Sequence, residues 1–432
     1  MTTAARAPLQ LPWRTGLAYG ALAAPLAFVS LPLYVNLPHH YASVAGAPLA
    51  ALGGVLLATR ALDALIDPAL GRLADRLFRQ GKGQGHAWWA AVLGCVLLAL
   101  GFAALWHPPK DSATAMLVWL AGALLLTTLA YSAVCILHQA WGTRWGGAPA
   151  WRARVTAWRE GATLIGVLLA SALPLWLGFD ATSALLVLGL MLGLWSLHRL
   201  KLPVAQLADP VAPSPDRPQR SPWANASFRW LMLVFMLNGV ASAIPATLLP
   251  FFVADRLQAP QWQPLFLLGY FGAAALGLPL WVRAVGRRGL APSWRAGMGL
   301  SVLAFAATPW LGAGDGAVFA VICVASGLAL GADLALPAAL LTGVIHQGGA
   351  GGQSEGRYLG WWTCATKLNL ALAAGLVLPL LSWAGYRSGS TDAAALQALA
   401  WLYAGLPCVL KLGAALALWC AERHHPTWRH TT

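Results

Sequence analysis

The chain has 432 residues, of which 59% are hydrophobic and only 10% are Asp, Glu, Lys or Arg. This composition is too apolar for a soluble protein of this length and predicts a polytopic membrane protein. A net charge of +14 would suggest a nucleic-acid partner in a soluble domain, but Lys and Arg gather here in alternate loops, a pattern that sets membrane orientation.

Apolar runs long enough to cross a bilayer as a helix, about 20 residues each, recur about twelve times. We expect an all-α fold in which the first half of the chain holds six of these spans. They cover residues 12–37, a run ending at 74, 87–106, 115–139, a run starting at 156, and a run ending near 198, with the sequence GFDA as the turn between the last two.

Near the middle of the chain, residues 203–222 are rich in Pro, Asp, Arg, Gln and Ser and have no helical period, which is typical of a linker. We therefore expect an N-terminal six-helix bundle over residues 1–202, a linker over 203–227 and a C-terminal six-helix bundle over 228–432. The expected spans of the second half are residues 228–253, 265–285, 296–311, 317–345, 359–383 and 396–420. A basic turn after span eight echoes the turn after span two and favours a duplicated plan.

The loop charges predict the orientation of the chain. The odd-numbered loops hold Lys110, Arg256 and Arg387, whereas the even-numbered loops and both ends of the chain hold most of the other Lys and Arg residues. This bias predicts cytoplasmic termini and a cytoplasmic linker. The short basic amino terminus runs into the first span without a convincing cleavage site, so we expect that span to be retained in a multi-pass protein of the bacterial inner membrane.

One stretch, residues 58–84, carries charge inside an apolar span. Arg60, Asp63 and Asp67 stand at positions i, i+3 and i+7, which a helix places on one face. Two carboxylates this close attract a cation, and inside a membrane they are stable only when Na+, a proton or a basic partner neutralises them. We therefore predict a cation site at Asp63 and Asp67, with Na+ bound there if Na+ is the coupling ion.

A proline directly after these acids supports the prediction. Pro68 has no N–H, so the carbonyl of Ala64 loses its helical donor and is free to coordinate a hard cation. The alternative is a structural ion pair of the acids with Arg60 or Lys367 that only holds helices together. Intramembrane acids are costly enough to make a functional site the default expectation.

Several motifs resemble the glycoside–pentoside–hexuronide:cation symporters, the melibiose carrier-like family of the major facilitator superfamily. They are RALDALIDPALGRLADR, the turn pattern GxLADRxxRxxG after span two, Tyr19 and Gly20 early in span one, GADLALPAALLTGVI in span ten, Arg159 and Lys367. The resemblance implies two six-helix bundles in the major facilitator fold, transport by alternating access, and a coupling-cation site at Asp63 and Asp67 with the hydroxyl of Ser132.

Departures from the family pattern affect the ion and the solute. Ile66 stands where the family often has Asn, which favours H+ over Na+ as the coupling ion. Ala27 and Cys135 stand where the melibiose carrier has two sugar-binding Asp residues, so the resemblance does not imply a galactoside site. The solute is a sugar or glycoside, or alternatively a lysolipid or another anionic or amphipathic molecule.

The remaining polar residues of the spans are candidate solute contacts, each with a structural alternative. His138 is a solute or proton-relay residue or a hydrogen-bonded packing residue, and Arg159 contacts solute or extends to the membrane surface. Asp333 and Asn238 form a solute or proton site or a polar clamp, in which Asp333 bonds Asn238 or Lys367. Lys367 contacts solute or pairs with Asp63.

The turn after span two suggests a gate, in which Asp75 and Arg76 latch the cytoplasmic side and Arg60 neutralises the empty cation site. The chain has no HExxH and no paired metal ligands in a span, so we do not expect an enzyme. The sequence therefore predicts a monomeric, cation-coupled symporter for a small solute, working in the lipid bilayer without a cofactor and without nucleic acid.

Overall fold

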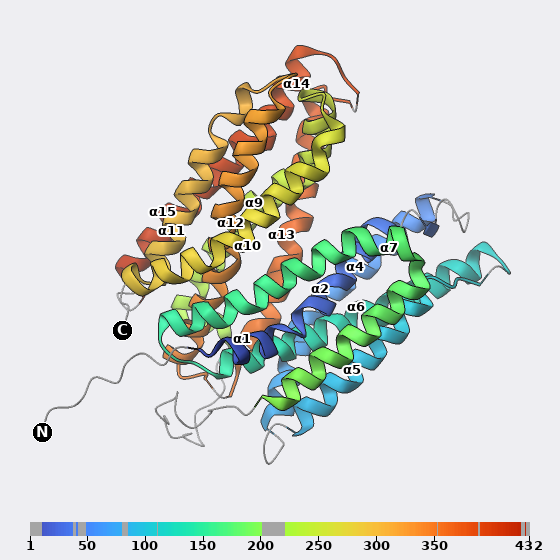
Figure 1. The fold of residues 1–432 in the computed structure, drawn as a ribbon, viewed down its shortest axis with the longest axis vertical. Coiled ribbons are helices and arrows are strands. Elements are labelled where there is room, and N and C mark those ends of the chain that lie inside the picture. The colour runs from blue at the N-terminus through green and yellow to red at the C-terminus, as the bar shows by residue number, and fades with distance from the viewer. Residues whose placement is uncertain are drawn as a thin grey trace, which may run out of the picture. The chain divides into compact units, whose positions relative to one another are not determined.

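The computed structural model describes residues 11–37, 40–41, 49–79, 85–109, 111–200, 221–351, 353–387, 389–424 and 428, and these form helices joined by short turns (Figure 1). The expected all-α fold class is confirmed, and eight helices within these ranges are long and apolar enough to cross a membrane. Residues 203–220 of the expected linker and residues 80–84 after span two lie outside the described residues.

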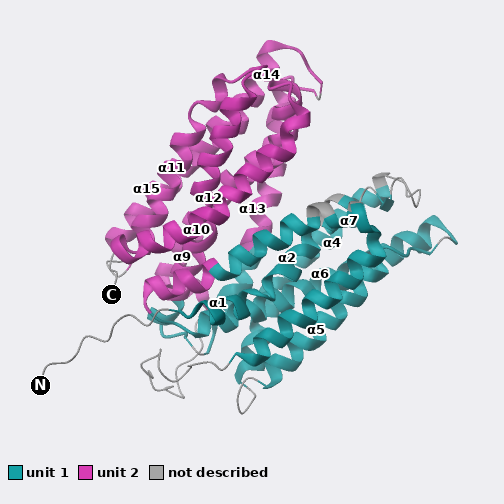
Figure 2. Cartoon of the chain, in the orientation of Figure 1, with its two compact units in different colours: residues 1–147, 158–219, 345–364 teal, residues 148–157, 220–344, 365–432 magenta. Residues whose placement is uncertain are grey.

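The chain divides into two compact units, drawn in teal and magenta in Figure 2. The first unit comprises residues 1–147, 158–219 and 345–364, and the second comprises residues 148–157, 220–344 and 365–432. The domain boundaries expected above stay predictions.

Besides the beginning of α13 (Glu355–Trp383), the first unit contains α7, except for its start, and the helices that precede it. They are α1 (Trp13–Gly20), α2 (Ala23–Leu31), α4 (Leu49–Arg79), α5 (Gly85–Ala104), α6 (Ala113–Arg144) and α7 (Pro149–Arg199). Helix α6 packs against both α4 and α5. Close helix contacts in this unit use small residues, as membrane helices commonly do, since Gly94 and Gly101 of α5 lie against Val134 and Thr127 of α6.

Two backbone features shape the helices of this unit. Pro25 has no N–H to donate to the carbonyl of Ala21, and the first span opens into a turn at residues 21–22 between α1 and α2. Gly178 adopts φ 78° and ψ 171°, a conformation suited to glycine, and this reverses α7 between its two halves. The expected turn at GFDA is thus confirmed.

The start of the fifth span differs from the expectation. Helix α7 begins at Pro149 instead of residue 156, so Arg152 and Arg154 are helical and not loop residues. Proline is well suited to a first helical position because its missing N–H would have no helical acceptor there.

The second unit contains the helices of the second half. They are α9 (Ala226–Phe251), α10 (Gln263–Arg288), α11 (Leu290–Phe305), most of α12 (Gly316–Gln347), the later part of α13 (Glu355–Trp383), α14 (Ala393–Ala400) and α15 (Leu406–His424). Helix α15 packs against α9 and α11. A π-helical segment, η7 (Trp401–Gly405), joins α14 to α15 just before Pro407, whose missing N–H removes a regular helical bond.

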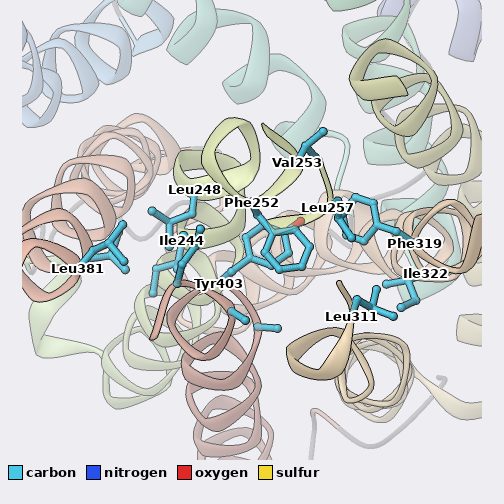
Figure 3. Close-up of a cluster of buried hydrophobic side chains, with 14 of the residues drawn as sticks. Ile244, Leu248, Phe252, Val253, Leu257, Leu311, Phe319, Ile322, Leu381 and Tyr403 are labelled. Atoms are coloured by element: carbon cyan, nitrogen blue, oxygen red, sulfur yellow. The ribbon is translucent and has the colours of Figure 1, made fainter. Parts of the chain in front are cut away.

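The apolar core of the second unit gathers around aromatic rings from several helices (Figure 3). The rings of Phe252 and Tyr403 stack with centroids 4.3 Å apart, and Phe319 of α12 contacts both. This cluster brings the end of α9 together with α12 and η7, and the burial of these large side chains stabilises that end of the unit.

The same end of the second unit is tied by hydrogen bonds from the segment after α9. The Asp255 carboxylate accepts hydrogen bonds from the Tyr386 hydroxyl and the Gly389 N–H, and the Arg256 guanidinium donates to the Leu311 carbonyl at 2.7 Å. Burial, together with the neighbouring Asp255, raises the pKa of Tyr386 above its ordinary value, so the phenol remains a donor at neutral pH.

Candidate functional site

Helix α4 carries both predicted cation ligands in buried positions. Asp63 and Asp67 are 6% and 0% exposed, and α4 continues through Pro68 without a break. They stand one helical turn apart, as the spacing predicts. The sequence therefore places two carboxylates and a carbonyl freed by proline along the same part of one buried helix.

The structure adds the third predicted ligand from a neighbouring helix. The Ser132 hydroxyl on α6 donates a hydrogen bond to Asp63 Oδ1 at 3.1 Å, and Ser132 is fully buried. Two carboxylates and a hydroxyl offer hard oxygen atoms, the ligands that Na+ prefers over sulfur or nitrogen, and a carboxylate can also bind a proton. This arrangement can hold a monovalent cation or carry a proton on a carboxylate.

The two basic residues considered as partners of these acids lie differently. Arg60 is exposed, whereas Asp63 and Asp67 are buried, so the three side chains do not share one environment. Lys367 belongs to the second unit, and its pairing with Asp63 stays a prediction.

The C-terminal end of α4 binds the beginning of α13 within the first unit. The buried Asp75 carboxylate accepts hydrogen bonds from the N–H groups of Gly356 and Arg357, at 2.7 and 3.0 Å. These N–H groups belong to the first turn of α13, where helical backbone donors lack intrahelical acceptors and the helix dipole favours an anion. The predicted latch residue Asp75 therefore has a defined receptor, whereas Arg76 is exposed.

A buried ion pair lies next to this contact and was not predicted. Arg144 at the end of α6 lies 3.0 Å from Glu355, and its guanidinium also stacks over the Phe78 ring at 4.1 Å. Glu355 is completely buried. The sequence marks Arg144 only as one of several loop arginines, and nothing in the spacing of the two residues indicates that they meet.

Backbone contacts make the crossing of α4 and α13 exceptionally close. A Cβ atom added at Gly360 would lie 2.6 Å from the carbonyl oxygen of Asp67, and one at Gly71 would collide with the Gly356 carbonyl. The crossing therefore extends from Asp67, a predicted cation ligand, to Asp75, a predicted latch residue, so a movement of α13 along α4 would change the surroundings of both.

His138 forms a reciprocal pair with Tyr19. The Tyr19 hydroxyl donates to the His138 carbonyl at 3.1 Å, His138 Nε2 lies 2.9 Å from the Tyr19 carbonyl, and the two rings lie 4.5 Å apart. These contacts fit the packing alternative for His138, and its role as a solute contact stays a prediction.

Arg159 forms an ion pair with its neighbour on α7. Its Nε and Nη2 donate to Glu160 Oε1 at 3.0 and 2.6 Å. Glu160 was not among the predicted residues, because an acid beside a basic residue at the start of a span resembles an interfacial pair.

Asn238 and Asp333 meet in the second unit, as the clamp alternative predicts. Asp333 accepts hydrogen bonds from Asn238 at 3.0 Å, from the Trp294 indole at 2.8 Å and from the Lys411 ammonium at 2.7 Å. Lys411 also donates to the Asn238 side-chain oxygen at 2.9 Å. We call Asn238, Trp294, Asp333 and Lys411 the polar tetrad; it joins helices α9, α11, α12 and α15.

Lys411 is the member of the tetrad that the sequence did not reveal. It lies in an apolar run of the last span, and in the structure it neutralises the intramembrane carboxylate that was expected to pair with Asn238 or Lys367. A solute role for Asn238 and Asp333 stays a prediction.

Comparisons with known proteins identify the family of the chain. A family model described as MFS/sugar transport protein matches residues 16–421. The inner membrane symporter YicJ of Escherichia coli K12 is 26% identical over 279 residues, an alignment that spans 62% of this chain and 59% of YicJ. A second protein of the same strain, YagG, whose name refers to glycoside/cation symport, is 28% identical over 169 residues, which are 38% of this chain and 36% of YagG.

Solved structures show the fold. The proton:xylose symporter XylE superposes with a TM-score of 0.66 and 13% identity, over 96% of this chain and 98% of XylE. A bacterial homologue of the iron transporter ferroportin superposes with a TM-score of 0.69 and 15% identity, over 96% of this chain and all of that chain. The expected fold of two six-helix bundles is confirmed, and the chain is a multi-pass membrane protein of a transporter family and not of an enzyme family. It belongs to the glycoside–pentoside–hexuronide:cation symporter family of the major facilitator superfamily.

Proposed function

We propose that this chain imports a small solute, a sugar or glycoside, together with H+ or Na+, by alternating access. The observation that carries the proposal is the buried group of Asp63, Asp67 and Ser132 oxygens on α4 and α6. Carboxylates in an apolar span are expensive unless they are neutralised, so an ion that binds them changes the free energy of every state in which they are buried.

The charge of the Asp63 and Asp67 carboxylates couples cation binding to solute transport. An empty site leaves unneutralised carboxylates, which oppose closure around a dry cavity, whereas bound cation and solute together lower that cost. The loaded carrier therefore crosses, and the empty carrier crosses after its acids are neutralised by a basic residue, for which Arg60 and Lys367 are the candidates. Asp75 and the first turn of α13 act as the cytoplasmic latch that must open for release.

The loop charges support an orientation with both termini in the cytoplasm, and we place the protein in the bacterial inner membrane as a monomer. The named relatives are symporters, which supports symport with a small solute over export or signalling. A lysolipid or other amphipathic or anionic solute is the alternative cargo on the same fold.

Uptake into membrane vesicles tests the proposal. Vesicles with the wild-type protein should accumulate a sugar or glycoside only under an imposed Na+ or H+ gradient, and Asp67→Cys should abolish that dependence. Accumulation without any gradient, or normal coupling in Asp67→Cys, would contradict the cation site. Uptake of lysolipids in place of every sugar would support the alternative cargo.

A further inference from the structure

The Asp and Glu residues of the first unit are unevenly distributed among its helices. Helices α1, α2, α5 and α6 contain no Asp or Glu, and the acids of α4 belong to the cation site and the latch. Helix α7 contributes Glu160, and the Asp180 carboxylate at its reversal is largely exposed. Glu355 at the start of α13 is completely buried in its pair with Arg144, so Glu160 is the partly exposed carboxylate of an ion pair in this unit that neither the cation site nor the latch uses.

Burying Glu160 costs free energy, so an ion pair at this position is expected to have a function besides packing. The side chains of Arg159 and Glu160 are 14% and 15% exposed, and the pair directly precedes the apolar stretch of α7. Burying two charges gains little net stability even when they pair well, because both lose hydration. Both side chains are nevertheless partly exposed.

Neighbouring contacts hold the pair in one geometry. Both bonds from Arg159 end on Glu160 Oε1, while Oε2 takes no hydrogen bond from the described residues. Gly16 and Gly20 of α1 lie directly against Trp158, the residue before Arg159. One carboxylate oxygen is therefore preoriented as an acceptor beside a guanidinium whose remaining donors are close by.

This chemistry matches a neutral polyol. A carboxylate accepts hydrogen bonds from hydroxyl groups, and an adjacent guanidinium donates to hydroxyl oxygens, so the two together suit neighbouring hydroxyls of a sugar ring. The pair has no net charge and therefore offers no advantage to an anionic solute, whose carboxylate would meet Glu160 with repulsion.

We propose that Glu160, held by Arg159, is a solute-binding carboxylate that makes this transporter select neutral sugars or glycosides over sugar acids. This inference rests on the proposed function and names the solute class for it.

The experiment compares two solute series that differ at one carbon. Purified full-length protein is titrated with methyl hexopyranosides and with the matching methyl hexuronides, whose C6 is a carboxylate. The wild type should bind a neutral member more tightly. Glu160→Gln keeps the size of the side chain, removes its charge and leaves Arg159 cationic, so affinity for the neutral series should fall about 10-fold or more while affinity for the uronides rises.

A merely structural ion pair would not produce opposite changes in the affinity for the two solute series. Loss of both series in parallel, or unchanged affinity for both, would overturn the role of Glu160. Glu422→Gln, which removes the acid of the Arg295–Glu422 pair in the second unit, is the matched control and should leave both affinities unchanged. If Glu160→Gln does not fold, the double variant Arg159→Gln/Glu160→Gln removes both charges; it should lose neutral sugar binding, and retained binding overturns the inference.

The two proposals fail separately. If the wild type binds neutral sugars and Glu160→Gln binds them equally well, the role of Glu160 is contradicted and the proposed symport is not. If the wild type binds neither series, and its stability does not respond to Na+ or pH through Asp67, the proposed function falls as well.

Discussion

The Ser132 hydroxyl on α6 donates to the Asp63 carboxylate on α4 at 3.1 Å, joining residues 69 positions apart in the chain. This bond connects two helices at the level of the proposed cation site. It makes the geometry of the carboxylate dependent on helix packing and not on α4 alone.

Replacement of Ser132 by Ala should weaken cation binding without preventing transport. The lost bond to a charged acceptor predicts that the cation concentration for half-maximal uptake rises about 3- to 30-fold. Uptake measured against Na+ concentration and against pH checks this. Thr128→Ala on the same helix removes a hydroxyl that bonds only its own helix backbone and should leave the value unchanged; an equal effect in both variants would argue against Ser132 as a ligand.

Replacement of Asp75 by Asn should release the first turn of α13. The amide group cannot act as an anionic acceptor for the N–H groups of Gly356 and Arg357, so their hydrogen exchange should quicken by about 10-fold. Exchange measured by mass spectrometry on peptides from the start of α13 checks this. The exposed Asp111, changed to Asn, serves as the control; unchanged exchange in Asp75→Asn would show that these donors do not depend on the carboxylate.

A methyl group at Gly360 should disturb the crossing of α4 and α13. The added Cβ would lie 2.6 Å from the Asp67 carbonyl oxygen, so the helices must separate, at a cost of about 1–3 kcal/mol in unfolding free energy. A lower midpoint of thermal unfolding in detergent, with weaker cation stabilisation, is expected. Gly375→Ala on the same helix meets no atom within 4 Å and should be neutral or slightly stabilising. Equal midpoints for the two variants would contradict the close crossing.

Loss of Lys411 should destabilise the second unit through the polar tetrad. Lys411→Met leaves the Asp333 carboxylate buried without its cation, which should cost about 3–5 kcal/mol in unfolding free energy. The double variant Asp333→Asn/Lys411→Met removes both charges and should recover most of that loss. Thermal unfolding of the single and double variants gives the coupling; additive losses would mean that the two residues do not act as a pair.

Local patterns in the sequence determined much of the fold and part of the candidate site. Apolar runs of membrane length predicted the helices, because every backbone polar group in a bilayer must be satisfied within its own segment. The i, i+4 spacing of Asp63 and Asp67 predicted neighbouring buried carboxylates on α4, because helical geometry depends only on nearby residues. The turn at Gly178 was likewise evident from local composition.

Only the tertiary structure decided which distant groups meet. Lys411 and Asp333, Arg144 and Glu355, and the acceptor Asp75 with the N–H groups of α13 are pairs joined by helix packing across long stretches of chain. Their partners carry no local pattern, and for Gly356 the interacting group is backbone, which every residue type shares. The sequence alone could indicate that intramembrane charges need partners, since burial makes unpaired charge costly, but the identity of each partner depends on the three-dimensional arrangement of the helices.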